Sequence, residues 1–221
     1  SKGGDWRYER MDGFHVIVGK KTGTKPDRAV VYFPGGGSRR WQLPYRGSIR
    51  NYIEGTGAEL WIPLYPLLPD YDLMDETEFT IRLHEKMLKR FPAENIVWLG
   101  ISGGADVLMQ AGRHMVKKYP ELPMPGLMLP VSVSGLLMSE DAKTRMRGID
   151  SRDPILHWDM FETMVKYYNP NGDLPQYILG KADEDDYTGF PKIIMYFGGD
   201  EVFAGIAPDY EKSFIRCGVK D

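Results

Sequence analysis

Ser102 is the residue whose type and setting best suit chemistry. It lies at the centre of a Gly-x-Ser-x-Gly sequence at 100–104, directly after the apolar run 96–99 and before a helix-period segment that begins near Ala105. A strand, a tight turn and a helix form the setting of a nucleophile elbow, in which the strained turn lifts a serine hydroxyl above the edge of a sheet. Glycines suit this turn because side chains there would clash with the neighbouring strand and helix. The pentapeptide alone also fits an ordinary strand-to-helix turn.

A second glycine-rich turn lies upstream. The apolar run 30–33 leads into Pro34 and then into the three glycines 35–37. Consecutive glycines leave backbone N–H groups unshielded, as an oxyanion hole requires when a tetrahedral intermediate develops negative charge. The two turns together favour acyl transfer through a serine more strongly than either turn alone.

Length and composition limit the class of protein. A chain of 221 residues suits a single domain with a sizeable core, and its net charge of −3 gives no basic footprint for nucleic acid. No apolar stretch is long enough to span a membrane, and the first residues do not form a signal peptide. Cys217, the only cysteine, has no internal disulfide partner. These features favour a cytoplasmic setting.

The elements that must position the two glycine turns can be read from the hydrophobic pattern. Apolar, β-rich runs recur at 29–33, 60–65, 96–99, 127–131 and 193–197. Several of them are continuously apolar, as in strands covered on both faces, and helix-period segments separate most of them. The pattern predicts a three-layer α/β/α sandwich around a mostly parallel, doubly wound sheet.

Three helices follow from period and capping. One is expected from a cap at Asp75 to about Arg90, with Glu78 completing a capping box. Further helices are expected between 102 and 120 and over 208–217, the last ended by a glycine. The buried stripe of the first consists of residues at helical spacing, namely Phe79, Leu83, Met87 and Phe91.

Residues 139–187 differ from the rest of the single domain 1–221. They are polar, contain prolines, are rich in Trp, Tyr and Met, and carry one expected helix at 153–168. We interpret them as a cap-like or lid-like excursion over the carboxyl ends of the strands, where ligands bind in α/β proteins. The acidic run 183–186 suggests either a cation site or a solvated loop, and block-like charge favours the loop.

With these turns in order, the chain resembles the α/β-hydrolase fold, in particular the hormone-sensitive-lipase-like esterases (alpha/beta hydrolase fold-3). That family pairs an HGGG oxyanion motif with a GDSAGG elbow and carries a D-Y-R-L-A-P-E-like segment between them. The counterparts here are 34–37, 100–105 and 64–70, and the likeness continues through 191–201, where the family places its catalytic acid after a strand. It covers nearly the whole chain from about Asp27.

The resemblance implies a role for particular residues. Ser102 is the nucleophile, and the N–H groups of Gly36, Gly37 and Gly103 form the oxyanion hole. The implied reaction is hydrolysis of small carboxylic esters through an acyl-enzyme, as in carboxylesterases and acetylesterases. No metal and no organic cofactor are implied.

The acid has two candidates, Asp200 and Glu201. Counting forward from Pro191 favours Asp200, whereas aligning backward from Phe203 places Glu201 in that position. Asp200 is the preferred assignment. Without the resemblance, the pair also fits an acidic turn that precedes a helix.

Three substitutions depart from the family pattern. Pro34 replaces the motif histidine and has no N–H to donate, so whatever that histidine orients must be held differently. Ile101 replaces the usual acidic residue beside the nucleophile, and Leu64 stands where an aspartate is common.

The largest departure is the missing base. In this fold the histidine follows the acid, and none follows Asp200. The resemblance therefore places the histidine beyond residue 221, in a loop that follows a last strand beginning at 219–221. That last strand and the last helix are expected to be lacking. The alternative is a catalytically inactive hydrolase-fold protein that binds a ligand or partner through the same cleft. The four histidines present are expected to be surface or structural residues: His15, His84, His114 and His157.

Aromatic residues are candidates for the substrate pocket. Trp41 and Tyr45 follow the glycine loop, and Trp158 lies in the excursion, so all three could wall an apolar acyl pocket or pack as core and lid. The expected partner is a small ester substrate, with no nucleic acid and no membrane span. The oligomeric state is left open, with a homodimer as one option.

Overall fold

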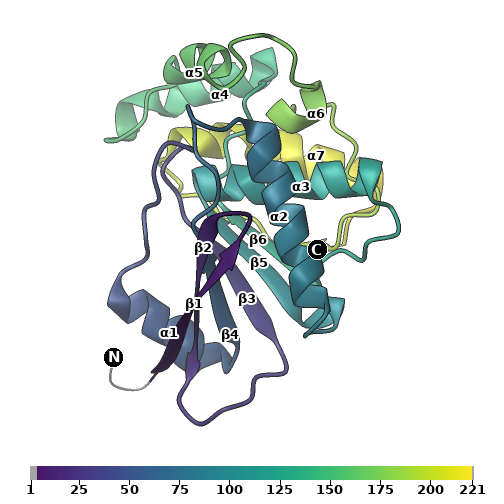
Figure 1. Ribbon diagram of the computed structural model, residues 1–221. Coiled ribbons are helices and arrows are strands. Elements are labelled where there is room, and N and C mark those ends of the chain that lie inside the picture. Colours follow the sequence, from purple (N-terminus) through teal and green to yellow (C-terminus); the bar gives the residue numbers. More distant parts are fainter. Residues whose placement is uncertain (1–3, 221) are drawn as a thin grey trace.

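A seven-stranded sheet forms the centre of the molecule (Figure 1). The computed structural model describes residues 4–220. The strand order across the sheet is β1-β2-β4-β3-β5-β6-β7. The strands are β1 (Gly4–Met11), β2 (Phe14–Lys21), β3 (Ala29–Phe33), β4 (Glu59–Pro63), β5 (Ile96–Ile101), β6 (Leu127–Val131) and β7 (Lys192–Ile193).

The sheet is mostly parallel. β1 pairs antiparallel with β2, and β2 antiparallel with β4, whereas β4, β3, β5, β6 and β7 pair in parallel. The β1–β2 hairpin turns at Asp12 and Gly13, whose positive φ angles of 52° and 87° match the two-residue turns that suit twisted hairpins. The expected mixed fold with a doubly wound, mostly parallel sheet is confirmed.

Helices cover both faces of this sheet (Figure 1). On one face α2, α3 and α7 pack against alternate strand residues such as Val31 and Phe33, and on the other face Ile53 of α1 packs against Val30 and Tyr32. The alternation follows from the period of two along a strand. The helices are α1 (Arg46–Thr56), α2 (Leu73–Leu88), α3 (Gly103–Lys118), α4 (Glu140–Ile149), α5 (Met160–Tyr168), α6 (Gln176–Leu179) and α7 (Ala207–Cys217).

Four of the five expected strands lie where the apolar runs predicted them. The fifth, expected at 193–197, pairs regularly only at 192–193, with one further bridge between Val131 and Tyr196. Beyond β7, the Ile193 N–H donates to the Lys220 carbonyl at 3.3 Å, so the chain runs back alongside this edge. Asp221, in the segment expected to begin another strand, lies outside the described residues.

The expected cap of α2 was wrong by one turn. Asp72, and not Asp75, is the N-cap, and its carboxylate accepts hydrogen bonds from the N–H groups of Met74 and Asp75. The Asp75 carboxylate in turn accepts a hydrogen bond from the Asp72 N–H. The capping box therefore consists of Asp72 and Asp75 rather than of Asp75 and Glu78. The expected stripe is buried as predicted, with each of its four side chains at most 4% exposed.

The excursion 139–187 contains three helices rather than one. The segment expected to be helical over 153–168 is helical only from Met160, because Asp153 turns its carboxylate to the N–H groups of Ile155 and Leu156 and holds a turn there. α4 and α6 were not predicted. α4, α5 and α6 lie together at the top of Figure 1, at the end of the sheet where the parallel strands finish.

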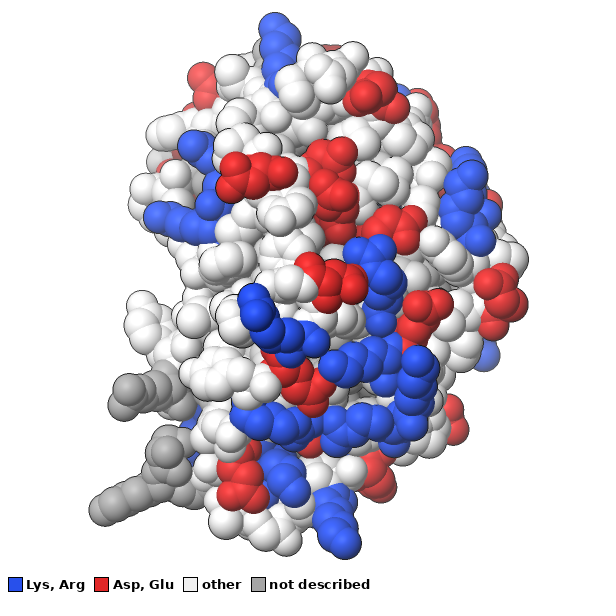
Figure 2. All heavy atoms as spheres, in the orientation of Figure 1, with Lys and Arg blue, Asp and Glu red and all other residues white. Residues whose placement is uncertain are grey.

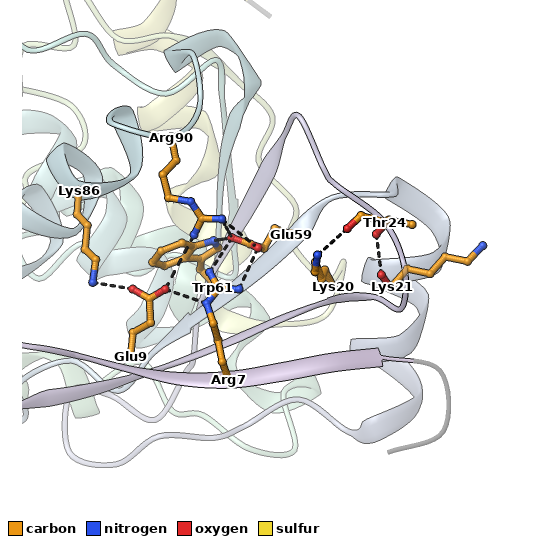
Figure 3. Close-up of polar contacts among 9 residues, drawn as sticks. All are labelled: Arg7, Glu9, Lys20, Lys21, Thr24, Glu59, Trp61, Lys86 and Arg90. Atoms are coloured by element: carbon orange, nitrogen blue, oxygen red, sulfur yellow. Dashed lines mark hydrogen bonds and ion pairs between the residues drawn. The ribbon is translucent and has the colours of Figure 1, made fainter.

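An aromatic and charged network joins the hairpin to α2 (Figure 3). The buried indole of Trp61 lies between the guanidinium groups of Arg7 and Arg90, whose carbons are 5.7 Å and 5.3 Å from the ring centroid. Both arginines also pair with the carboxylate of Glu59, and Arg7 pairs with Glu9. The network ties β1 to β4 and to the end of α2.

The face with this network carries charges of both signs. Figure 2 shows lysine and arginine side chains gathered over the lower part of this face, interspersed with acidic ones. Among residues 4–220, no helix is both long enough and apolar enough to cross a membrane.

Candidate active site

The Gly-x-Ser-x-Gly turn adopts a strained elbow. Ser102 follows β5 and precedes α3 with φ 54° and ψ −127°, a conformation that an L-residue rarely adopts. A β-carbon on Gly100 would lie 2.3 Å from the Gly104 carbonyl oxygen, and one on Gly104 would lie 2.1 Å from that of Phe33. These backbone contacts explain why glycine is required on both sides of the serine.

The upstream glycine loop lies against this elbow. A β-carbon built on Gly103 would be 2.7 Å from the Gly37 nitrogen, and one built on Gly35 would be 3.4 Å from the Ser102 β-carbon. The two glycine turns, 67 residues apart at Gly35 and Ser102, therefore meet, as the sequence predicted, and Ser102 is partly exposed beside them.

The glycine loop, residues 34–38, is fixed through its carbonyl oxygens. Every carbonyl from Pro34 to Ser38 accepts a hydrogen bond from outside its own peptide unit. The donors, in chain order of the acceptors, are the Tyr65 hydroxyl (2.5 Å), the Gln42 N–H (2.8 Å), the Arg39 N–H (3.3 Å), the Tyr168 hydroxyl (2.6 Å) and the Leu68 N–H (2.8 Å). Because each carbonyl is engaged, the loop has little freedom to rotate its peptide planes.

Two amides of the glycine loop and the first amide of α3 have no hydrogen-bond acceptor among the described residues. Within residues 4–220, the N–H groups of Gly36, Gly37 and Gly103 donate to no carbonyl or side-chain acceptor. Gly103 is the first residue of α3, where N–H groups lack partners in the helix and the helix dipole favours negative charge. Unpaired amides beside a serine can hold a negatively charged oxygen.

Glu201 and Asp200 differ in environment. The Asp200 side chain is 71% exposed and pairs with Arg152 at 3.3 Å. Glu201 is partly buried, its Oε2 accepts a hydrogen bond from the Ser132 hydroxyl at 2.9 Å, and its buried Oε1 has no partner among the described residues. Ser132 adjoins Val131, whose carbonyl accepts the Ser102 N–H, so Glu201 is the acid held close to the elbow.

Asp106 supports the segment that carries Ser132. Its carboxylate, in the first turn of α3, accepts bonds from the N–H groups of Ser134 and Gly135 and from the Ser134 hydroxyl. Burial raises the pKa of Asp106 despite these bonds. α3 therefore holds both the elbow and the loop after β6.

Glu76 lies buried beneath the glycine loop. Its side chain comes from the first turn of α2, and Oε2 accepts a hydrogen bond from the Ser38 hydroxyl at 2.9 Å. Ser38 is itself buried, with a positive φ of 53°. Burial raises the pKa of Glu76 well above its ordinary value.

The histidines lie in other parts of the structure. His84 Nε2 is 2.8 Å from the Pro123 carbonyl oxygen, and burial lowers the pKa of its ring. His114 contacts Glu78 and Tyr177. His157 is exposed, and its Nδ1 lies 3.6 Å from Oδ2 of Asp150. His15 lies in β2. No histidine of residues 4–220 forms a hydrogen bond with Ser102 or Glu201.

The aromatic candidates for the substrate pocket lie apart from one another. Tyr45 lines a cavity of about 500 Å³ that Gly35 and Ile101 also line, so this cavity reaches the residues that flank the nucleophile. Trp158 lines a different cavity, of about 440 Å³, within the excursion. Trp41 donates its indole N–H to the Tyr65 carbonyl at 3.0 Å.

The acidic run 183–186 is only in part the solvated loop that the sequence favoured, because Glu184 and Asp186 are exposed whereas Asp185 is buried. Asp185 is 5% exposed, accepts the Lys181 N–H and lies 3.4 Å from the Arg113 guanidinium. The run anchors the excursion to α3. Within the described part of the chain, no group of three His, Cys, Asp or Glu side chains is placed to hold a metal ion.

Several residues of the site were not predicted from the sequence. Ser38, Tyr168 and Ser132 gave no signal, because their partners are distant in the chain. Glu76 did give a signal in the sequence. It lies three residues before Phe79 on the apolar stripe of α2, and a carboxylate at such a position must be buried.

Comparison with known proteins places the geometry in a fold. No family model matches the chain, and no curated protein matches it. Solved structures do, at low identity. A bacterial esterase of the hormone-sensitive lipase family is 18% identical with a TM-score of 0.81 over 99% of this chain and 73% of its own. A hormone-sensitive lipase from a metagenome library is 21% identical, with a TM-score of 0.78 over 100% of this chain and 74% of its own.

A third structure is the esterase EstE5 in a crystal soaked with p-nitrophenyl butyrate. It is 17% identical, with a TM-score of 0.81 over 100% of this chain and 73% of its own. The chain therefore has the α/β-hydrolase fold of hormone-sensitive-lipase-type esterases.

Proposed function

We propose that this protein is a serine hydrolase of small carboxylic esters, with Ser102 as the nucleophile. The observation that carries the proposal is the contact between the elbow and the glycine loop, where Gly103 and the Gly37 nitrogen are too close for any side chain between them. The strained φ of Ser102 and the unpaired amides support the same reading. A protein that only binds a ligand has no evident use for all three features.

In the proposed reaction the Ser102 hydroxyl attacks the ester carbonyl. The negative charge that develops on the carbonyl oxygen is held by the N–H groups of Gly36, Gly37 and Gly103. A general base takes the Ser102 proton during the attack and returns it to the departing alkoxide, which leaves as the alcohol. Water, deprotonated by the same base, then attacks the acyl-enzyme, and the Ser102 oxygen regains a proton as the acid is released. The ester group would approach from the cavity beside Gly35 and Ile101, which suits a small, short-chain substrate.

The proposal assigns Glu201, in preference to Asp200, as the acid. Its unpartnered buried Oε1 is available to a base, whereas the carboxylate of Asp200 is exposed and paired with Arg152. The base itself would be an imidazole from outside the described residues, because no histidine within them forms a hydrogen bond with Ser102 or Glu201. The excursion 139–187 would form a cap, in contact with the glycine loop through Tyr168.

A second candidate is an inactive hydrolase-fold protein that binds a ligand or partner at the same cleft. It is favoured because no described histidine forms a hydrogen bond with Ser102 and because Pro34 replaces the motif histidine. The two candidates differ in whether Ser102 can be made to turn over an ester.

Added imidazole separates them. Hydrolysis of p-nitrophenyl acetate and butyrate is measured with and without imidazole for the wild type and for Ser102→Ala, which also corrects for hydrolysis by imidazole alone. Ser151→Ala, a substitution at an exposed serine, is the matched control. In imidazole, the wild type and the control should hydrolyse the esters at least about tenfold faster than Ser102→Ala. This factor is a modest share of the rate acceleration that a general base contributes.

Equal rates for the wild type and Ser102→Ala in imidazole would reject the serine hydrolase. Binding of the same esters without turnover would then support the second candidate.

A further inference from the structure

The part of the structure beneath the glycine loop carries an inference about how the oxyanion hole is held, and it rests on the proposed function. Residues 34–38 form hydrogen bonds with three separate elements: Tyr65 follows β4, Tyr168 ends α5, and Glu76 lies in the first turn of α2. The first two contact carbonyl oxygens of the loop. Glu76 accepts a hydrogen bond from the only polar side chain of residues 34–38, the buried Ser38.

We propose that Ser38 and Glu76 form a buried positioning pair that fixes the glycine loop for oxyanion binding, with Glu76 acting through Ser38. Ser38 directly follows Gly37, whose N–H is a donor of the proposed hole, and it adopts a left-handed φ that a serine takes up only when its surroundings hold it. A hydrogen bond of 2.9 Å to a fully buried carboxyl group supplies that hold.

The pair functions with Glu76 as the neutral acid. Oε1 of Glu76 has no hydrogen-bond partner, and no basic side chain among those described pairs with the carboxyl group. The titratable groups that face it are acidic or phenolic: Asp72 and Asp75 from α2, Asp106 from α3, Tyr65 from the segment after β4 and Tyr168 from α5. An uncompensated buried charge is costly, and burial accordingly raises the pKa of Glu76.

Neutrality also matters for the reaction. A carboxylate one hydrogen bond from Ser38 would place a negative charge directly beneath amides that must accept another negative charge from the substrate. The low dielectric of the site would strengthen this repulsion. Ionisation of Glu76 should therefore weaken the hole as well as loosen the loop.

The experiment compares Ser38→Ala, Glu76→Ala and Glu76→Gln by two independent measurements. Hydrogen exchange of the peptide that contains the glycine loop reports its order without any need for turnover. Ester hydrolysis in imidazole, corrected with Ser102→Ala, reports kcat and KM. Ser151→Ala is again the matched control.

Ser38→Ala and Glu76→Ala should each raise loop exchange and lower kcat by about tenfold or more, with KM changed little, because a disturbed donor affects the transition state most. Glu76→Gln keeps an acceptor for Ser38 without an ionisable group, so it should restore both. As pH rises through the raised pKa of Glu76, the wild type should lose kcat and loop protection relative to Glu76→Gln.

The proposal is overturned if Ser38→Ala leaves both loop exchange and kcat at the wild-type level, or if Glu76→Gln is as damaged as Glu76→Ala. Should Glu76→Ala not fold, Ser38→Ala and Glu76→Gln still decide the matter. If the wild type shows no Ser102-dependent hydrolysis but loop exchange responds as expected, the serine hydrolase fails and the positioning pair stands.

Discussion

Replacing Glu76 by glutamine should change how the free energy of unfolding depends on pH. In the folded protein the pKa of Glu76 is raised well above 4.5 by burial, and in the unfolded chain it returns to about that value. Between the two values the folded state holds a proton that the unfolded state has lost. The folded state is then stabilised less as pH rises, because stability falls wherever the native state binds more protons.

The magnitude follows from linkage. Below about pH 4.5 the carboxyl group is neutral in both states and imposes no such cost. Above it, the wild type loses up to about 1.4 kcal/mol of unfolding free energy per pH unit until the folded pKa is reached. Glu76 is completely buried, so solvent screening does not reduce this figure appreciably.

The assay is urea unfolding followed by tryptophan fluorescence at several pH values. Glu76→Gln should resemble the wild type near about pH 4.5 and become progressively more stable than it as pH rises. Glu211→Gln, the same substitution at an exposed position of α7, should differ from the wild type by an amount that does not vary with pH. A difference between Glu76→Gln and the wild type that stays constant across this range would refute the reasoning.

Three further predictions concern the elbow, the acid and the hairpin. Gly103→Ala would push a β-carbon against the glycine loop and should lower kcat for Ser102-dependent hydrolysis by about 10²-fold, comparable to loss of one oxyanion donor; wild-type kcat would contradict the contact. Glu201→Gln should reduce the imidazole-assisted rate while Asp200→Asn does not, and the opposite order would restore Asp200 as the acid. Arg7→Ala removes one of the two arginines that pair with the buried Glu59, and it should lower the free energy of unfolding in urea by about 1–3 kcal/mol. The control Arg28→Ala, at an exposed ion pair, should lower it by less than about 0.5 kcal/mol. Equal losses of unfolding free energy would argue against the network.

The sheet could be predicted because its signals are local. Continuous apolar runs such as 29–33 and 127–131 cannot be solvated, so they reveal buried strands without any knowledge of their neighbours. The elbow was predictable for a similar reason, since the glycines around Ser102 are required by contacts within one turn and with the adjacent strand.

The errors in helix boundaries arose where more than one local hydrogen-bond partner was available to a side chain. Asp72 and Asp75 are both residues that can cap a helix. The sequence alone does not show which of the two carboxylates faces the free N–H groups of the first turn. Asp153 lies before a helical pattern, but its carboxylate binds the N–H groups of Ile155 and Leu156 and also that of Val202, and this distant bond fixes the turn. The hydrophobic periodicity of a segment cannot reveal a contact with a residue 49 positions away.

The substitution of Pro34 for the motif histidine has a physical answer in the contacts of the glycine loop. A proline cannot donate, but it keeps its carbonyl, and the Tyr65 hydroxyl binds that carbonyl at 2.5 Å. The far end of the loop is held by Tyr168 and by the pair of Ser38 with Glu76. These anchors come from a core segment, a helix of the excursion and α2, so the shape of the amide cradle depends on how those three elements pack. A displacement of α5 would release the Gly37 carbonyl and the peptide plane that joins Gly37 to Ser38. The excursion is thus coupled to the glycine loop by a direct hydrogen bond, and a ligand that moves α5 would alter the loop that carries the proposed oxyanion donors without touching Ser102.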